Sequence, residues 1–191
     1  CCLRVYGNIG AIDEGQAMHI KIEKLGFLEG DVSTGNALAR MYAKCRILTA
    51  AQGVFDRLLV RDILSWTLLI QGYAECDRTQ EVLECLELMK LEGFSPNAAT
   101  FSCILKVCGN IKSLEIGESI HDEVRKDGSL KRNCFVGTSL VDMYAKCGVL
   151  GKAQEVFDKL PDRDVVAWNA LISGYSQQGC NTEAINCFLR M

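Results

Sequence analysis

The sequence predicts an all-α protein, an alpha-alpha superhelix in which helix-turn-helix hairpins stack into a solenoid. Three observations predict this fold class. The 191 residues include only two prolines, and proline is poorly tolerated inside helices. Apolar residues recur at helical spacing in paired stripes. Long stretches of sequence also return after a fixed interval, as expected of a repeat protein.

The apolar stripes follow the positions i, i+3, i+4 and i+7, which lie on one face of a helix. The four clearest stripes are Ala51/Val54/Phe55/Leu58, Trp66/Leu69/Ile70/Tyr73, Val82/Cys85/Leu86/Met89 and Ala153/Val156/Phe157/Leu160. Short links such as Cys76-Asp77-Arg78 and Cys147-Gly148-Val149 separate paired stripes, which predicts helical hairpins. Because the residue before proline disfavours helix, Ser95-Pro96-Asn97 and Leu160-Pro161-Asp162 are expected to end second helices.

The internal repeat has a separation of 102 residues. Met41-Tyr42-Ala43-Lys44-Cys45 returns as Met143-Tyr144-Ala145-Lys146-Cys147, and Gly72-Tyr73 returns as Gly174-Tyr175. A glycine inside a helix costs about 1 kcal/mol relative to alanine. The recurrence of Gly72 and Gly174 within first helices therefore predicts a close approach between neighbouring helices.

A shorter period divides the single predicted solenoid, residues 1–191, into hairpin units. These units are 1–31 (partial), 32–62, 63–97, 98–133, 134–164 and 165–191 (partial). One hairpin does not bury its apolar stripe alone, so neighbouring units must stack. The incomplete units at both ends predict a segment of a longer protein. Terminal apolar residues such as Phe188 and Met191 should then be exposed and support self-association.

Composition argues against several classes of function, although a net charge of −3 does not exclude a local basic face. The net charge of −3 shows none of the basic excess that usually accompanies nucleic-acid binding. The eleven cysteines are odd in number and contain no Cys-x-x-Cys pair, so neither a metal site nor another cofactor is expected. Several cysteines lie on apolar faces, where they act as small hydrophobic residues in a reducing compartment. No apolar run is long enough to span a membrane.

Three stretches carry a family resemblance. They are residues 164–175 (DVVAWNALISGY), residues 141–148 (VDMYAKCG), and residues 101–108 followed by 117–121. They resemble the P, S and L motifs of the pentatricopeptide repeat family, specifically its plant P-L-S subclass. The resemblance covers the whole chain and implies L (partial), S, P, L, S and P (partial) units in order. Arg46, Leu59-Val60 and Cys76-Asp77 depart from the motifs at turns, which predicts a slightly irregular first S unit.

The resemblance implies binding of single-stranded RNA, one base per repeat, read by two or three side chains. In the family, the fifth and last residues of each motif read the base. Carried over, the pairs are Asn36 with Asp62, Thr67 with Asn97, Ser102 with Asn133, and Thr138 with Asp164, followed by Asn169 without its partner. The implied register, 5′ to 3′, is U, A, a weak L position, G and a pyrimidine.

The chemistry of these residue types allows two interpretations. Asparagine offers a donor and an acceptor to a pyrimidine edge, and threonine or serine leaves room for a purine with one hydroxyl contact. The same residue types are also ordinary helix caps. Their recurrence at fixed positions of a recognisable motif favours base reading.

Three further residues have similar alternatives. Phe135, at the second position of its unit, can stack on a base, which is worth about 1–3 kcal/mol, or it can join neighbouring hairpins. Lys44 and Lys146 occupy equivalent points on S-unit first helices. They can neutralise phosphates, or they can be ordinary solvated lysines.

An enzymatic function is not expected. His121-Asp122-Glu123 matches the H-x-E element of zinc deaminases, which are domains found in related plant proteins. Its repeat counterpart His19-Ile20-Lys21 lacks the glutamate, and neither proline precedes a cysteine. The match is therefore interpreted as a coincidence.

The leading hypothesis is sequence-specific binding of single-stranded RNA in organelle RNA metabolism (editing, splicing or processing) in a plant mitochondrion or chloroplast. Protein partners in an RNA-processing complex fit this hypothesis. The alternative is a protein-binding helical scaffold without RNA affinity, which the acidic balance slightly favours. A segment that only spaces other repeats is a further alternative.

Overall fold

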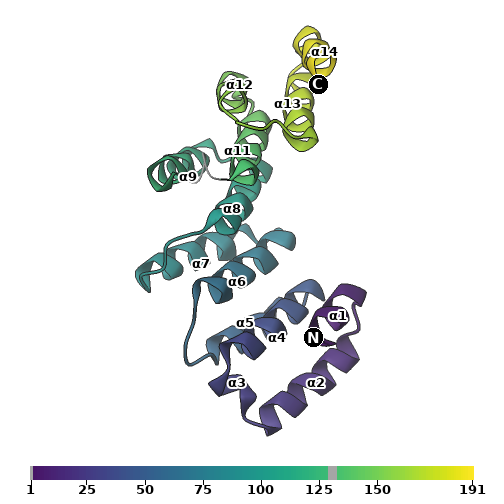
Figure 1. Ribbon diagram of the computed structural model, residues 1–191, viewed down its shortest axis with the longest axis vertical. Coiled ribbons are helices and arrows are strands. Elements are labelled where there is room, and N and C mark those ends of the chain that lie inside the picture. The colour runs from purple at the N-terminus through teal and green to yellow at the C-terminus, as the bar shows by residue number, and fades with distance from the viewer. Residues whose placement is uncertain (1, 129–132) are drawn as a thin grey trace. The chain divides into compact units, whose positions relative to one another are not determined.

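The computed structural model describes residues 2–128 and 133–191 and contains only helices among them (Figure 1). It confirms the all-helical solenoid class. The chain divides into two compact units, Cys1–Asn97 and Ala98–Met191. Residues 129–132, which fall within the predicted unit 98–133, lie outside the described residues.

The first unit contains three successive helical hairpins. Its helices are α1 (Cys2–Ile9), α2 (Ile12–Lys24), the single-turn α3 (Phe27–Gly30), α4 (Val32–Lys44), α5 (Leu48–Asp56), α6 (Ile63–Glu75) and α7 (Thr79–Leu91). The first helix of the middle hairpin, α4, packs against the first helices α1 and α6 on either side. The three first helices therefore form one layer, and each also packs against the second helix of its own hairpin.

The second unit repeats this arrangement. Its helices are α8 (Ala98–Asn110), α9 (Leu114–Asp127), α11 (Cys134–Lys146), α12 (Leu150–Asp158), α13 (Val165–Gln177) and α14 (Asn181–Arg190). Here α11 is central and packs against α8 and α13. First helices thus begin at residues 32, 63, 98, 134 and 165, which are also the first residues of the units expected from sequence.

The apolar stripes form the core. Every residue of the four stripes named above is buried except Tyr73, which is half-buried. The Tyr73 hydroxyl reaches across to α5 and donates a hydrogen bond to Oε1 of Gln52 (3.0 Å). Tyr175 and Gln154 repeat this contact at 3.1 Å. The tyrosine of the stripe therefore packs in the core and also hydrogen-bonds its hairpin to the preceding one.

The recurrent glycines confirm the predicted close helix approach. A Cβ atom placed on Gly72 would lie 2.8 Å from Cβ of Ala43, and one placed on Gly174 would lie 2.6 Å from Cβ of Ala145. Both distances are shorter than carbon atoms tolerate. The hydrogen of glycine is thus what lets α6 approach α4, and α13 approach α11.

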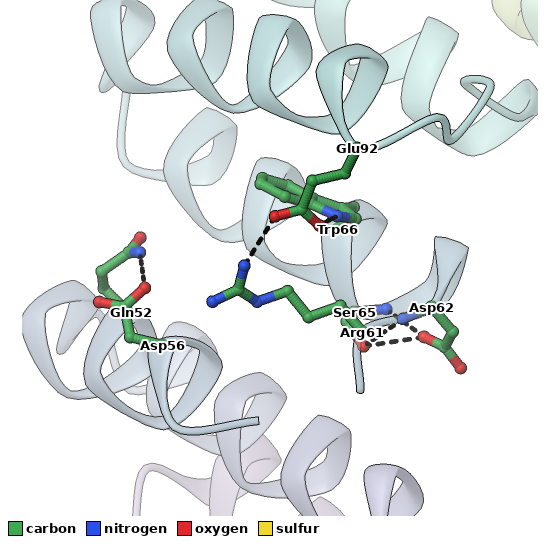
Figure 2. A network of polar contacts seen from close by, with 7 residues as sticks. All are labelled: Gln52, Asp56, Arg61, Asp62, Ser65, Trp66 and Glu92. Atoms are coloured by element: carbon green, nitrogen blue, oxygen red, sulfur yellow. Dashed lines mark hydrogen bonds and ion pairs between the residues drawn. The ribbon is translucent and has the colours of Figure 1, made fainter. Parts of the chain in front are cut away.

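Aromatic contacts join α5 to α6 and α12 to α13. The rings of Phe55 and Trp66 meet edge to face with centroids 4.6 Å apart, and Phe157 and Trp168 do the same at 4.6 Å. Figure 2 shows a polar addition to the first of these contacts: Glu92 accepts hydrogen bonds from Arg61 (2.7 Å) and from the indole of Trp66 (3.2 Å). This carboxylate therefore fixes residues from three segments of the first unit.

The turns after α4 and α11 each contain a residue with a left-handed backbone conformation, whether that residue is glycine or not. Arg46 (φ 60°) and Gly148 (φ 77°) are repeat equivalents. In both copies the turn keeps the same two backbone bonds: Arg46 N to Ala43 O and Ile47 N to Tyr42 O, repeated as Gly148 N to Ala145 O and Val149 N to Tyr144 O. The irregularity expected at Arg46 is thus limited to a residue with a side chain in a conformation that favours glycine.

Helix α7 ends earlier than the proline at residue 96 requires. It ends at Leu91, because Gly93 adopts a left-handed conformation (φ 84°). The backbone N–H of Phe94 then donates a hydrogen bond to the carbonyl of Met89 (3.0 Å), which closes the helix end. Glycine after the last apolar residue was the sequence signal for this end. Helix α12 ends at Asp158, three residues before Pro161.

Several cysteines are structural. Cys85, Cys108 and Cys187 are buried, and burial raises the pKa of Cys85 to about 12 and that of Cys108 to about 11. These thiols pack as small hydrophobic groups. Across residues 2–128 and 133–191, no cluster of three metal-ligating side chains occurs, and no helix has the length and apolarity needed to cross a membrane.

Apolar side chains are exposed on the last helix and directly after it. Phe188 is 67% exposed and Met191 is 51% exposed. This is the exposure on which the self-association hypothesis depends, and the hypothesis itself stays a prediction.

Candidate nucleic-acid interface

The first-helix layer of the first unit carries a groove of about 520 Å³, here called the α1–α4–α6 groove. Asn36, from the second turn of α4, and Asp62, which precedes α6, both line it. Arg4 and Arg40 contribute the positive charge. One proposed reading pair therefore lies in this groove.

The first-helix layer of the second unit carries a groove of about 610 Å³, the α8–α11–α13 groove. Ser102, Thr138 and Asn169 line it, each from a different first helix. Lys106 and Lys146 also line it. Three residues expected at the fifth position of successive units therefore face a common groove.

Two of the proposed reading pairs, both in the first unit, are directly bonded. Nδ2 of Asn36 donates to Oδ1 of Asp62 (3.2 Å), and Nδ2 of Asn97 donates to Oγ1 of Thr67 (3.1 Å). The Thr67 hydroxyl in turn donates to the carbonyl of Ile63 (2.7 Å). The structure thus brings together residues 26 and 30 positions apart in sequence, although Thr67 and Asn97 do not line either groove.

Neither pair in the second unit is bonded directly. Asn133 accepts a hydrogen bond from Phe135 N (3.0 Å), and Asp164 accepts one from Ala167 N (2.8 Å). These are helix N-cap contacts. The capping interpretation is therefore correct for these last residues, as it is for Asp62, which bonds Ser65 N at 2.7 Å (Figure 2).

Hydrogen bonds also set the ionisation of Asp62. Burial by itself raises the pKa of this carboxyl, but hydrogen bonds from Ser65 and Asn36 outweigh it and hold the pKa below its usual value. Asp62 is therefore an anion that can only accept hydrogen bonds.

Three of the fifth-position side chains carry a polar atom that has no hydrogen-bond partner among the described residues. The Asn36 Oδ1, Ser102 Oγ and Thr138 Oγ1 atoms are shielded from water and have no hydrogen-bond partner in the described structure. Asn36 is 4% exposed and Thr138 is 7% exposed. Leaving a buried polar group unsatisfied costs about 1–3 kcal/mol. The fold gains nothing from these atoms, which makes them candidates for ligand contact.

The two lysines at equivalent positions of α4 and α11, Lys44 and Lys146, are already ion-paired. Lys44 Nζ lies 2.8 Å from Glu75 Oε1, and Lys146 Nζ lies 2.7 Å from Asp142 Oδ2 and 3.3 Å from Asn110 Oδ1. Lys146 lines its groove and Lys44 does not. A phosphate would have to compete with a carboxylate at either lysine.

Phe135 and Asn169 are both exposed. Phe135, in the first turn of α11, is 69% exposed and does not line the α8–α11–α13 groove. Ser33, Leu64 and Val166, which hold the same second position in their units, do line the grooves.

Sequence reasoning missed three cations that have no acidic partner in the part of the chain that the structure describes. Arg4, Arg40 and Lys106 line the grooves but received no role, because nothing in their local sequence distinguishes them from solvated side chains. The one available signal was the equivalence of Arg4 and Lys106 at the 102-residue interval.

His121 has a structural contact. Its Nδ1 atom shares a hydrogen bond with the Tyr144 hydroxyl (2.8 Å), and His19 shares the same bond with Tyr42 (2.9 Å). Because the contact recurs at His19, which lacks the accompanying glutamate, it explains His121 without reference to zinc chemistry.

The layer of glycine-packed first helices and the grooves it carries define a helical-repeat protein. Models of the PPR repeat family match residues 61–110, and models of the PPR repeat match 138–165 and 166–191. The chain belongs to the pentatricopeptide repeat family.

Relatives in Arabidopsis thaliana support this assignment. The chain is 40% identical over 189 residues to pentatricopeptide repeat-containing protein At4g18520, chloroplastic, covering 99% of this chain and 30% of that protein. It is 37% identical over 189 residues to At3g09040, mitochondrial, covering 99% of this chain and 18% of that protein. The chain thus spans less than a third of either relative.

A solved structure shows the same fold. The pentatricopeptide repeat protein PPR10, in complex with an 18-nt psaJ RNA element, superposes with a TM-score of 0.77 at 18% identity. The match covers 97% of this chain and 28% of PPR10.

Proposed function

We propose that the chain binds single-stranded RNA through its first-helix layer, with one base at each fifth-position residue. The observation that carries this proposal is the set of unpartnered polar atoms at Asn36, Ser102 and Thr138, which line the two grooves. Side-chain rotamers commonly change when partners bind, so a modest rotation would bring these atoms to a base. The RNA complex of PPR10, which shares the fold, supports the same choice of ligand.

The proposed base preferences follow the reading pairs. Asn36 with Asp62 selects U, Thr67 with Asn97 selects A, and Thr138 with Asp164 selects G. Ser102 with Asn133 discriminates weakly, and Asn169 faces a pyrimidine. The Asn36 contact supports the first assignment, because the bond to Asp62 leaves the amide oxygen and one N–H for a uracil edge.

The units are proposed to follow the P-L-S order. The first helices that begin at residues 32, 63, 98, 134 and 165 support it, because their spacing is uneven in the way the three motif types require. The whole protein is proposed to act in RNA editing, splicing or processing. The proposed location is a chloroplast or mitochondrion, because the names of the relatives specify those organelles. Its RNA-processing complex would supply protein partners.

Base selectivity is the direct test. Fluorescence anisotropy of a labelled RNA with the proposed register should give tighter binding than a scrambled RNA of equal composition. The double variant Thr67→Asn/Asn97→Asp should then shift the preference at that base from A to U. An unchanged ranking of RNAs would refute the reading pairs. If neither RNA binds at low salt, the protein-binding scaffold becomes the better interpretation.

A further inference from the structure

We infer that Arg4 and Arg40 form a phosphate clamp in the α1–α4–α6 groove, where two cations from adjacent helices hold the backbone of the bound strand. The inference rests on the RNA binding proposed above. It assigns the phosphate contact to residues other than Lys44 and Lys146.

Helix packing places the two arginines on the same groove. Arg4 stands on α1 and Arg40 on α4, and both line the groove. The helices approach closely at this level: a Cβ atom placed on Gly7 would lie 3.2 Å from Cα of Met41, the residue after Arg40. Arg4 precedes Gly7 by one helical turn.

Neither guanidinium group has an acidic partner among the described residues. Four other arginines are ion-paired: Arg57 with Glu23, Arg61 with Glu92, Arg78 with Glu81, and Arg125 with Asp122. Arg4 and Arg40 are exposed and take part in no such pair. Asp62 is the acidic residue that lines the groove, and its Oδ1 already accepts from Asn36 and Ser65.

The arginines suit a phosphodiester. A guanidinium group donates paired hydrogen bonds that match the oxygens of a phosphate. Arg40 also lies four residues after Asn36, so both side chains lie on the same face of α4. A nucleotide whose base meets Asn36 would therefore carry its phosphate toward Arg40, and Arg4 would hold it from the neighbouring helix.

The second unit provides a natural comparison. At the 102-residue interval, Arg4 corresponds to Lys106 and Arg40 corresponds to Asp142. Asp142 is an acid and binds Lys146 at 2.7 Å. Counting partners among residues 2–128 and 133–191 only, the second groove thus keeps one unpaired cation, Lys106, where the first has two. The clamp belongs to the first unit only.

The salt dependence of RNA binding tests the clamp in the full chain. For single strands, log K falls with log salt concentration with a slope of about −0.7 for each neutralised phosphate. The double variant Arg4→Gln/Arg40→Gln should therefore reduce the magnitude of the slope by up to about 1.4 if each arginine neutralises one phosphate. The ligand is the labelled RNA of the proposed register, measured from about 50 to 200 mM salt. The double variant Arg57→Gln/Arg78→Gln, which also removes two positive charges but outside both grooves, should leave the slope unchanged.

Each outcome decides between the two proposals. A wild-type slope in the double variant overturns the clamp and leaves RNA binding intact. An equal loss of slope in Arg57→Gln/Arg78→Gln also overturns it, because net charge would then explain the effect. Absence of RNA binding by the wild-type chain at the lowest salt refutes the proposed function and the clamp together. Matching thermal melting curves for all three proteins would exclude unfolding as the cause of a change.

Discussion

Asn36 and Asp62 are joined by a hydrogen bond of 3.2 Å between the amide nitrogen and the carboxylate. The bond connects the fifth residue of one hairpin unit with its last residue. The same carboxylate oxygen accepts from Ser65 N, where it starts α6. One side chain thus stabilises a helix start and also orients the proposed base-reading amide, so capping at this position is compatible with the proposed recognition role.

Because Asp62 has two roles, its removal should lower the free energy of unfolding more than removal of its repeat equivalent, Asp164. Asp62→Ala should lose an N-cap worth about 1 kcal/mol and a further hydrogen bond to Asn36 worth about 1 kcal/mol. Asp164→Ala should lose the cap to Ala167 alone, since the described contacts of Asp164 include no bond to Thr138. Urea denaturation of both variants measures the difference. Equal losses would show that the bond to Asn36 contributes nothing to stability.

Gly72 predicts a steric defect when a methyl group is added. Gly72→Ala should destabilise the chain by about 1–3 kcal/mol, because the new Cβ would lie 2.8 Å from that of Ala43. Gly53→Ala is the matched control: it lies within α5 with nothing near its Cβ, so it should stabilise by up to about 1 kcal/mol. Thermal melting measures both. The second change Ala43→Gly should restore much of the stability lost in Gly72→Ala, and failure to do so would contradict this packing.

Arg46 predicts a stabilising substitution. It holds a left-handed conformation (φ 60°) where its repeat equivalent is Gly148. Since this conformation costs a side-chain-bearing residue about 1–2 kcal/mol, Arg46→Gly should raise the free energy of unfolding by up to about 1 kcal/mol after the entropy of glycine is allowed for. Arg57→Gly, in the right-handed region at the end of α5, should not stabilise. A lower melting temperature for Arg46→Gly would contradict the prediction.

The two histidines predict a loss of stability in mild acid. Burial is the main cause that lowers the pKa of both His19 and His121 in the folded chain. At His19, Glu23 raises the pKa and Arg57 lowers it further. At His121, Asp122 raises the pKa and the cations Arg125, Lys159 and Lys152 lower it further. Unfolded histidine titrates near about pH 6.5. Below that pH the unfolded chain binds more protons, so this contribution is fully present above about pH 6.5 and declines as the pH falls.

Comparison with a histidine-free variant isolates this effect from carboxyl titration. The double variant His19→Gln/His121→Gln should lose less stability than the wild-type chain between about pH 6.5 and 5. Urea midpoints at several pH values provide the measurement. Parallel curves for the two proteins would show that the folded histidines titrate like unfolded ones.

Much of the architecture could be predicted because it depends on local spacing. The apolar stripe Trp66/Leu69/Ile70/Tyr73 predicted a buried helix face, and the recurrence of Gly72 and Gly174 predicted a close approach. The end of α7 at Leu91 was missed, since Pro96 was taken as the stop while Gly93 acts first. Both signals were local, and the choice between them required the backbone conformation.

The positions of the candidate site residues could be predicted from the sequence, but their ion pairs could not. Ser102, Thr138 and Asn169 do line one groove, as equal positions in stacked hairpins should. The availability of Lys44 was not predictable, because its partner Glu75 lies 31 residues away on α6. The role proposed for Arg4 and Arg40 also required the tertiary structure, because it depends on neither arginine having an acidic partner among the described residues.

The sequence by itself determined the helices, their hairpin pairing and the residues that recur at each unit position, because these follow from the periodicity of side chains along one chain. Only the tertiary structure decided which side chains pair across units. Asn36 reaches Asp62, Lys44 is held by Glu75, and Thr138 keeps an unpartnered hydroxyl. Such pairing depends on separations of a few ångströms between helices distant in sequence, and the packing of small residues such as Gly72 against Ala43 sets those separations.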